Sequence, residues 1–490
     1  MLFNTIDFVI FFIILLTAVS ILRTRKYQHL LLLIGSYFFF YYSSNYLFFL
    51  LILSTLLDYF VGHEIWKAKN ITKRKILLIL SLGGNLGLLG FFKYADFAIL
   101  QFNIFGDTIN LNSHFPLLDL ALPIGISFYT FQTISYTVDI YRKKLEPSKS
   151  FLEFALFVSF FPQLVAGPIV RAKDFLPQLR EKMNDSRVSN KLKQIVIERK
   201  NLKIGITIMA IGFLKKMFFA DNIAPFVNEI FANPIGHESF TIILATIAFG
   251  LQIYGDFSGY SDIAIGAALI LGFKLPINFN KPYFATSPTD FWRRWHISLS
   301  TWLRDYLYIP IGGNKISPSR KYLNLFIVMF LGGLWHGASW NFVIWGLMHG
   351  AYLAINKILT DRFPHLTNLF SKHKALKILA LLITQYLVFL AWIPFRVRDV
   401  NDMLYSMNKF VILDFQTNET ISILLGRHKS TLLIMIIFVI LLIISYKKKN
   451  LVDTLANLEL KWWGVFLGII MTSIFFFYVG VQQDFIYFQF

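Results

Sequence analysis

The chain has 490 residues, of which 56% are hydrophobic, 17% aromatic and only 15% charged, with a formal net charge of +19 and a mean hydropathy of +0.57. A water-soluble domain carries about 25% charged residues, so this composition excludes the soluble globular class. The chain has no cysteine, which excludes disulfides, thiolate metal sites and cysteine nucleophiles.

Apolar runs long enough to cross a bilayer recur along the chain and predict an all-α, polytopic transmembrane helix bundle of about 11 to 13 helical elements. The first run begins at Ile6 and ends at Leu22, and we expect it to be retained because it lacks a basic n-region and a cleavage site. The segment Phe151–Val170 is interrupted by prolines and a glycine, which predicts a re-entrant or broken helix. The other predicted spans are His29–Tyr42, Tyr46–Val61, Ile76–Phe92, Leu117–Ile140, Ile204–Ala220, Ile242–Gly259, Asp262–Phe273, Leu323–Asn341, Val343–Ile358, Ala375–Ile393, Leu432–Ile444 and Trp463–Val479.

Lysine and arginine placement predicts the orientation of the chain. Basic residues follow the first, third and fifth predicted spans, and the basic stretch 171–203 is the longest polar segment. By the positive-inside rule these loops are cytoplasmic and the N-terminus is extracytoplasmic, which predicts a multi-pass protein of the inner (plasma) membrane. The positive charge is then explained by topology and contact with anionic membrane lipids, and we expect no nucleic-acid partner.

Two polar stretches lie among the apolar runs. The first is YGDFSGYSDIAIG at Tyr254–Gly266, and the second is Asn278–Asn314, which contains DFWRRWHISLSTWLRDYLYIPIGGN at Asp290–Asn314. Ser287 and Pro288 predict a helix start, and an aromatic stripe at helical spacing predicts an interfacial amphipathic helix over about 288–308. The stripe consists of Trp292, Trp295, Leu299, Trp302 and Tyr306. Arg293, Ser300 and Arg304 lie on its flank and His296 at its boundary. This helix either anchors the protein at the membrane surface, or its cationic flank binds a phosphate-bearing substrate beside His296.

A third stretch, GGLWHGASWNFVIWGLMHG at Gly332–Gly350, carries two histidines in an otherwise uncharged segment. Its glycines recur four residues apart, which lets neighbouring helices approach closely. A histidine at membrane depth is costly and marks a functional site by default, so His336 is either functional or a packed histidine that donates to a carbonyl. For His349, nearer a possible span end, the pattern favours packing.

The chemistry open to these histidines is narrow. We find no metal-binding motif such as HExxH, so no metal site is predicted, and no GxSxG nucleophile elbow. General-base catalysis remains, in which a neutral imidazole takes the proton of a hydroxyl that attacks an acyl group.

At these residues the chain resembles the membrane-bound O-acyltransferase (MBOAT) family, on the branch that acetylates extracytoplasmic polysaccharides such as alginate and peptidoglycan. The resemblance covers most of the chain, and the three stretches above carry it most specifically. The further motifs are STLLDYFVG at Ser54–Gly62, NLGLLGFFKYADF at Asn85–Phe97, LPIGISFYTFQTISYTVDIYR at Leu122–Arg142, FFPQLVAGPIVRAKDFLPQL at Phe160–Leu179 and WIPFR at Trp392–Arg396.

The resemblance implies one transmembrane domain over residues 1–490, with helices around a central tunnel, and a catalytic role for His336. It implies that His296 is the second histidine of this branch, toward the cytoplasmic donor side. The implied donor is a thioester, acetyl-CoA or an acyl carrier, with no bound cofactor. A separate extracytoplasmic transferase is the implied partner. We assign donor binding to Arg293, Ser300 and Arg304, and tunnel lining to Trp335, Trp340 and Asn341.

Two alternatives stay open at this point. D-alanyl transfer to teichoic acid from a carrier protein uses a related histidine in a more distant branch of the family. A proton-coupled transporter or scramblase would instead use Asp139, Asp256, Asp262 and His336 as a relay. We expect Asp256 and Asp262 to be structural, hydrogen-bonded within the bundle, because an unpaired buried carboxylate is costly.

Overall fold

The computed structural model describes residues 1–111, 114–164, 167–180, 192–448, 450–478 and 485–488. These residues are largely helical and form no strand, apart from one isolated bridge between Arg180 and Leu192. The all-α prediction is therefore confirmed for the described part of the chain. Contacts divide the chain into two units, one of residues 1–206 with 264–276 and one of residues 207–263 with 277–490. The expectation of a single domain with a tunnel stays a prediction.

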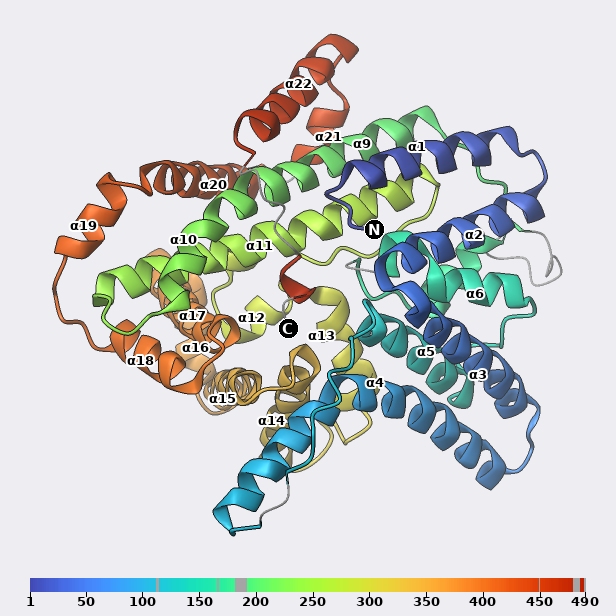
Figure 1. Cartoon of the computed structure of the whole chain (residues 1–490), viewed down its shortest axis with the longest axis horizontal. Coiled ribbons are helices and arrows are strands. Elements are labelled where there is room, and N and C mark those ends of the chain that lie inside the picture. Colours follow the sequence, from blue (N-terminus) through green and yellow to red (C-terminus); the bar gives the residue numbers. More distant parts are fainter. Residues whose placement is uncertain (112–113, 165–166, 181–191, 449, 479–484, 489–490) are drawn as a thin grey trace. The chain divides into compact units, whose positions relative to one another are not determined.

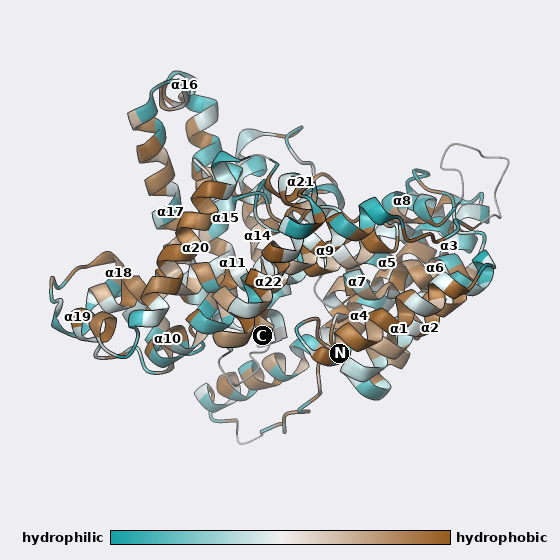
Figure 2. Ribbon diagram, turned by 90° about the horizontal axis from the view of Figure 1, so that it is seen from above, coloured by the Kyte–Doolittle hydropathy of each residue, from teal (hydrophilic) through white to brown (hydrophobic). Residues whose placement is uncertain are grey.

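Six helical stretches in the described chain are long and apolar enough to cross a membrane. Their outward side chains are apolar; Ile79, Leu382 and Leu433, for example, are all exposed. Figure 2 shows hydrophobic residues along much of such helices, α17 (Lys374–Arg396) among them. Exposed apolar faces of this extent require lipid, which agrees with the predicted polytopic protein. The six stretches are Arg25–Lys67, Ile71–Thr108, Ser239–Ile270, Trp340–Arg362, Lys374–Arg396 and Lys429–Lys447.

In the first unit, α5 (Ile126–Tyr141) is almost wholly buried by its neighbours α3, α4 and α6 (Figure 1). A buried Asp58 on α3 joins these helices: its carboxylate accepts hydrogen bonds from Ser81 (2.5 Å) and Asn85 (2.7 Å) on α4, and Ser81 also lies 3.0 Å from Thr137 of α5. The elements of this part of the chain are α1 Ile6–Ile21, α2 Arg25–Ser44, η1 Asn45–Leu47, α3 Phe48–Lys67, α4 Ile71–Thr108, α5, α6 Phe151–Ser159, α7 Phe161–Leu164, α8 Ala172–Phe175 and η2 Leu176–Leu179.

Two helices, α9 (Arg199–Phe213) and α11 (Ser239–Ile270), contribute residues to both units. The second unit holds the polar stretches that the sequence singled out. Its remaining elements are η3 Leu214–Ala220, α10 Asp221–Ala232, η4 Pro282–Phe284, α12 Pro288–Trp292, α13 Ile297–Leu303, η5 Arg304–Tyr308, α14 Pro318–His336, α15 Trp340–Arg362, α16 Pro364–Lys372, α17, α18 Val400–Val411, α19 Asn418–Leu425, α20 Lys429–Lys447, α21 Leu451–Ala456, α22 Leu460–Phe476 and η6 Ile486–Phe488.

The glycines of the third stretch bring α14 and α15 into close contact, as their spacing predicted. A Cβ atom at Gly333 would collide with the carbonyl oxygen of Phe342, and one at Gly346 would collide with that of Met329. The two backbones touch at these positions, so the hairpin of α14 and α15 depends on the missing side chains.

Several predicted elements differ from the structure. The span Leu323–Asn341 contains the end of α14 at His336 and the start of α15 at Trp340. The spans Ile242–Gly259 and Asp262–Phe273 lie along one 32-residue helix, α11, which ends at Ile270, because no residue between them breaks the helix. The span Leu117–Ile140 is helical only from Ile126, since Gly125 adopts a left-handed conformation (φ 78°) that ends the preceding extended segment. The predicted break in Phe151–Val170 is present, with α6 and α7 separated at Phe160.

A further difference concerns the interfacial helix predicted over 288–308. It is not continuous: α12 ends at Trp292, α13 begins at Ile297, and η5 is a π-helix. Its aromatic stripe is mostly buried in protein, with Trp295 and Leu299 almost inaccessible. This segment therefore packs into the second unit, and its interfacial position stays a prediction. Of the basic stretch 171–203, residues 181–191 lie outside the described part of the chain.

Candidate functional site

His336 is the last residue of α14 and is buried, with 5% of its surface exposed. The helix ends there because Gly337 and the turn before Trp340 follow, so the imidazole lies where two helices join. Aromatic rings surround it. Their centroid distances from the imidazole are 4.9 Å for Trp345, 5.0 Å for Trp335, 5.2 Å for Phe395 and 5.4 Å for Tyr487.

His296 lies in the same aromatic cluster, although it is distant from His336 in the sequence. Its ring centroid is 6.1 Å from Trp335 and 6.2 Å from Tyr487, both of which also contact His336. The structure thus brings together the two histidines assigned from the sequence, with Trp335 and Tyr487 as their shared neighbours. Their catalytic roles and the assignment of Trp335 to the lining of a tunnel stay predictions.

The backbone at His296 is left-handed (φ 42°, ψ 55°), a conformation that costs about 1–3 kcal/mol in a residue other than glycine. Asn278 holds it there. The carbonyl oxygen of Asn278 accepts from the Ile297 N–H (2.9 Å), and its side-chain Oδ1 accepts from the His296 Nδ1–H (3.1 Å) and from Ser298. Strain maintained by such specific contacts is typical of functional sites.

The bond to Asn278 determines which nitrogen of His296 can act as a base. An amide oxygen only accepts, so Nδ1 carries the proton and Nε2 carries the lone pair. The side chain is fully buried, and burial lowers the pKa of His296 to about 3. The imidazole is therefore neutral at pH 7, the form that a base or a hydrogen-bond acceptor requires.

Replacing Asn278 with leucine should reduce acyl transfer about 10-fold or more while the helices stay folded. The variant removes the acceptor that fixes the tautomer of His296 and leaves a buried donor unpaired, which costs about 1–3 kcal/mol. The measurement compares initial rates of Asn278→Leu and Asn278→Asp, since aspartate keeps an acceptor oxygen. Equal activity of wild type and the leucine variant would show that Asn278 does not orient His296.

His349 is also buried, one turn beyond Trp345 on α15. Its Nδ1 accepts a hydrogen bond from the indole Nε1–H of Trp292 (3.3 Å), and its ring packs against Trp345 at 4.7 Å. Trp345 thus lies between His336 and His349. A histidine held by an indole among packed rings fits the packing interpretation that the sequence favoured.

The three residues assigned to donor binding lie toward the surface of this segment. Arg293 is exposed, and Arg304 has 59% of its side chain exposed and pairs with Asp305 at 2.7 Å. The hydroxyl of Ser300 donates to the backbone carbonyls of Trp295 and His296. The cationic flank is thus accessible, whereas Ser300 is engaged in the turn, and donor binding by all three stays a prediction.

The other two residues assigned to tunnel lining differ in their surroundings. Trp340 begins α15 and is 52% exposed. Asn341 is buried, and its Nδ2 donates to the carbonyls of Val397 (2.5 Å) and Arg398 (3.2 Å) just after α17. Asn341 therefore fixes the end of α17 beside α15, and its assignment to a tunnel is not tested by these contacts.

Sequence reasoning missed Asn278 and Tyr487. Asn278 lies in NFNKPYF, an extended segment between helices with no periodic signal, although a polar residue flanked by apolar ones was visible there. Tyr487 has the aromatic neighbours Phe485 and Phe488 in the sequence, so it resembled the many other aromatic residues of this chain.

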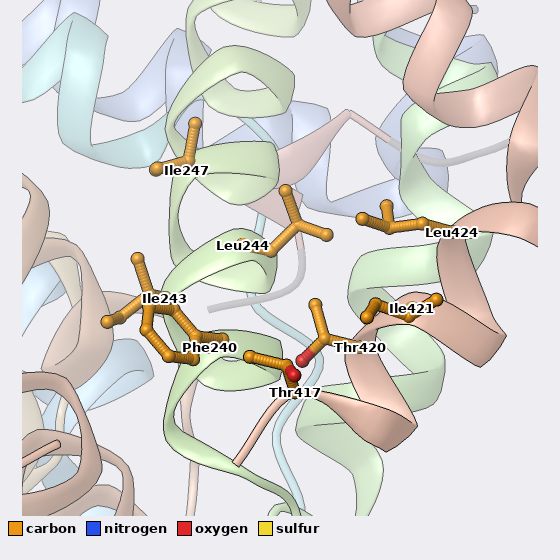
Figure 3. A pocket seen from close by; sticks show the side chains of 8 residues that line it. All are labelled: Phe240, Ile243, Leu244, Ile247, Thr417, Thr420, Ile421 and Leu424. Atoms are coloured by element: carbon orange, nitrogen blue, oxygen red, sulfur yellow. The ribbon is translucent and has the colours of Figure 1, made fainter. Parts of the chain in front are cut away.

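A separate apolar hollow of about 380 Å³ lies between α11 and α19 (Figure 3). Its lining consists of five aliphatic side chains, one phenylalanine and two threonines. None of the three histidines lines this hollow. Its lining residues are Phe240, Ile243, Leu244, Ile247, Thr417, Thr420, Ile421 and Leu424.

Comparison with known proteins identifies the family of the chain that carries this histidine cluster. Residues 141–393 match the profile of MBOAT, the membrane-bound O-acyltransferase family. The chain belongs to the membrane-bound O-acyltransferase family. It is therefore a multi-pass membrane acyltransferase, and His296, His336 and the helices α14 and α15 lie within the matched region.

Relatives of this acyltransferase are named for envelope polymers. It is 36% identical to the "Peptidoglycan O-acetyltransferase" of Helicobacter pylori over 89% of this chain and 86% of that protein. It is also 36% identical to the "Probable alginate O-acetylase AlgI" of Azotobacter vinelandii, over 82% of this chain and 76% of the relative. The "Teichoic acid D-alanyltransferase" of Streptococcus thermophilus is 30% identical over 48% of this chain and 56% of its own length.

Proposed function

We propose that this acyltransferase takes an acetyl group from a cytoplasmic thioester, acetyl-CoA, and passes it across the inner membrane for O-acetylation of an extracytoplasmic polysaccharide. The N-terminus is extracytoplasmic in this proposal, and a separate extracytoplasmic transferase completes the transfer to the glycan. The observation that carries the proposal is the pair His336 and His296, which share the rings of Trp335 and Tyr487 inside a member of an acyltransferase family.

The chemistry assigned to His336 is general-base catalysis. Its imidazole takes the proton of an acceptor hydroxyl while that oxygen attacks the thioester carbonyl; the C–O bond forms and the C–S bond breaks. The thiolate leaves, and the imidazolium returns the proton to it, so that the base is regenerated. The surrounding aromatic rings exclude water, which favours transfer over hydrolysis. His296, neutral and fixed by Asn278, contributes a lone pair at Nε2 to the same cluster.

A complementation experiment tests the acceptor. Cells lacking the gene receive wild type or His336→Ala, and base-released acetate is measured in purified peptidoglycan and in exopolysaccharide. The proposal predicts ester-linked acetate in one of these fractions only with wild type. D-alanine esters are measured in the same hydrolysates, because the similarity to a teichoic acid D-alanyltransferase makes carrier-dependent D-alanyl transfer the second candidate. D-alanine without acetate would replace the proposal by that candidate.

Arg304 offers a test of the donor-binding assignment. Arg304→Ala should raise the acetyl-CoA concentration needed for half-maximal rate about 3- to 10-fold, because an exposed guanidinium contributes roughly 1 kcal/mol to phosphate binding. The maximal rate should change less. Initial rates over a range of donor concentrations give both values, and an equal loss at saturating donor would exclude the phosphate-binding role.

A further inference from the structure

We propose that Asp256 is a positioning residue, whose carboxylate, held by the buried Lys216, fixes the main chain of the segment Phe485–Tyr487 against the two histidine rings. The catalytic part of this inference rests on the proposed function. The structural part does not, since it concerns how one segment of the chain is held.

Asp256 lies in the middle of α11 and divides its two carboxylate oxygens between two partners. Oδ1 lies 2.7 Å from Nζ of Lys216, and Oδ2 accepts a hydrogen bond from the backbone N–H of Ile486 at 2.7 Å. The same Nζ is also 2.8 Å from the carboxylate of Asp221. The Lys216 side chain is only 1% exposed. A buried carboxylate is costly unless it is paired and hydrogen-bonded, and here both conditions are met.

The local backbone lets Lys216 reach Asp256. Lys216 lies in the π-helix η3, a rare geometry that is frequent at functional sites. Gly259 lies one turn from Asp256 on α11. A Cβ atom there would lie 2.7 Å from the backbone carbonyl oxygen of Gly212 and 3.0 Å from the backbone nitrogen of Lys216. The two helices therefore touch through Gly259, which brings the ammonium group to the carboxylate.

The segment that Asp256 holds contacts both histidines. Phe485 packs on Tyr260 at 4.4 Å, one turn along α11 from Asp256. Tyr487 packs on Phe257 at 4.6 Å, and its ring contacts His336 and His296. Between these two anchored rings, the Ile486 N–H is bound by the Asp256 carboxylate. Loss of that bond should therefore release the ring of Tyr487 from the histidines.

The neighbouring ion pair provides a matched control. Lys215 and Asp262 lie on the same two elements, one and six residues away, and pair at 2.6 Å. This pair is partly exposed, and the ammonium group of Lys215 lies over the ring of Tyr254, whereas the Ile486 N–H is bound by Asp256. Removing the Asp262 charge therefore tests the loss of a carboxylate from α11 without loss of the hydrogen bond to Ile486.

Thiol labelling measures how the segment is held, without any acyl transfer. The chain has no cysteine, and Ile486 is 2% exposed, so Ile486→Cys introduces a single reporter and keeps its backbone N–H. In purified protein in detergent, a maleimide should label this cysteine slowly in the wild-type background. We expect labelling at least 10-fold faster with Asp256→Leu, faster by a smaller factor with Asp256→Asn, and unchanged with Asp262→Asn.

Two results would overturn the inference. One is an unchanged labelling rate in both Asp256 variants. The other is an equal rise with Asp262→Asn, which would show general loosening of α11. If the leucine variant fails to elute as a single species, the asparagine variant decides, because it keeps a neutral acceptor and the side-chain volume.

The kinetic readout separates positioning from folding. With Ile486 unchanged, Asp256→Leu should lower kcat while the KM for acetyl-CoA stays within about 2-fold, and Asp256→Asn should recover part of kcat. If neither wild type nor any variant transfers acetyl, but the labelling rates change as expected, the proposed function is wrong. The role of Asp256 in positioning the segment then still stands.

Discussion

Replacing His336 with alanine is expected to reduce acyl transfer at least 10³-fold while the protein remains folded in the membrane. General-base catalysis contributes about 10²–10⁴-fold. The two neighbouring histidines have other partners, because His296 is hydrogen-bonded to Asn278 and His349 to Trp292, and we expect neither to replace His336. Removing the base therefore leaves the acceptor hydroxyl without a proton acceptor. The measurement is the initial rate of acetyl transfer, normalised to protein that elutes as a single species.

His349→Gln is the matched control for this prediction. It changes a histidine that packs on the opposite side of Trp345, and glutamine keeps an acceptor for the Trp292 indole N–H. We expect it to keep most of the activity, whereas His336→Gln should be as inactive as His336→Ala. A His349→Gln variant as inactive as His336→Ala would show that the base has been assigned to the wrong histidine.

Replacing Gly346 with leucine is expected to have the largest effect on the fold. The new Cβ atom would collide with the Met329 carbonyl oxygen and approach the Phe330 Cα at 3.2 Å, so α14 and α15 would have to separate. Backbone atoms cannot move aside as a side chain can, and we expect destabilisation of about 3 kcal/mol or more. Fluorescence-detected size-exclusion chromatography after stepwise heating should show a lower midpoint and less folded protein than wild type.

Gly468→Leu controls for the general effect of adding an apolar side chain to a helix of this chain. Apart from the adjoining backbone of α22 itself, no heavy atom of the described residues lies within 4 Å of a Cβ placed at Gly468. This variant should elute and melt like wild type. If Gly346→Leu also behaved like wild type, the close contact of α14 with α15 would not be needed for the fold.

Much of the fold was predictable because bilayer thickness imposes a length on apolar helices. The runs at Ile6–Leu22, Val343–Ile358 and Ala375–Ile393 each fall within a helix of the structure or match it closely. The glycine spacing in Gly332–Gly350 also predicted the close pairing of α14 and α15. These signals are local in the sequence, and packing does not override them.

The parts that could not be predicted depend on contacts between distant segments. Helical spacing over 288–308 indicated one helix, but the bonds from Asn278 hold His296 in a left-handed conformation and divide it. The sequence also gave no reason to place Tyr487 beside His336, since that contact follows from the bond between Asp256 and Ile486. Of the candidate site, the identities of the two histidines were predictable and their surroundings were not.

One measurement tests the central claim most directly. Purified protein in proteoliposomes is given acetyl-CoA labelled in the acetyl group, and a cell extract supplies the acceptor and the partner. Thioester cleavage and transfer of the label are followed together for wild type and His336→Ala. We predict cleavage coupled to transfer with wild type and neither above background with His336→Ala. Equal cleavage and transfer by the two proteins would contradict the assignment of His336 as the base.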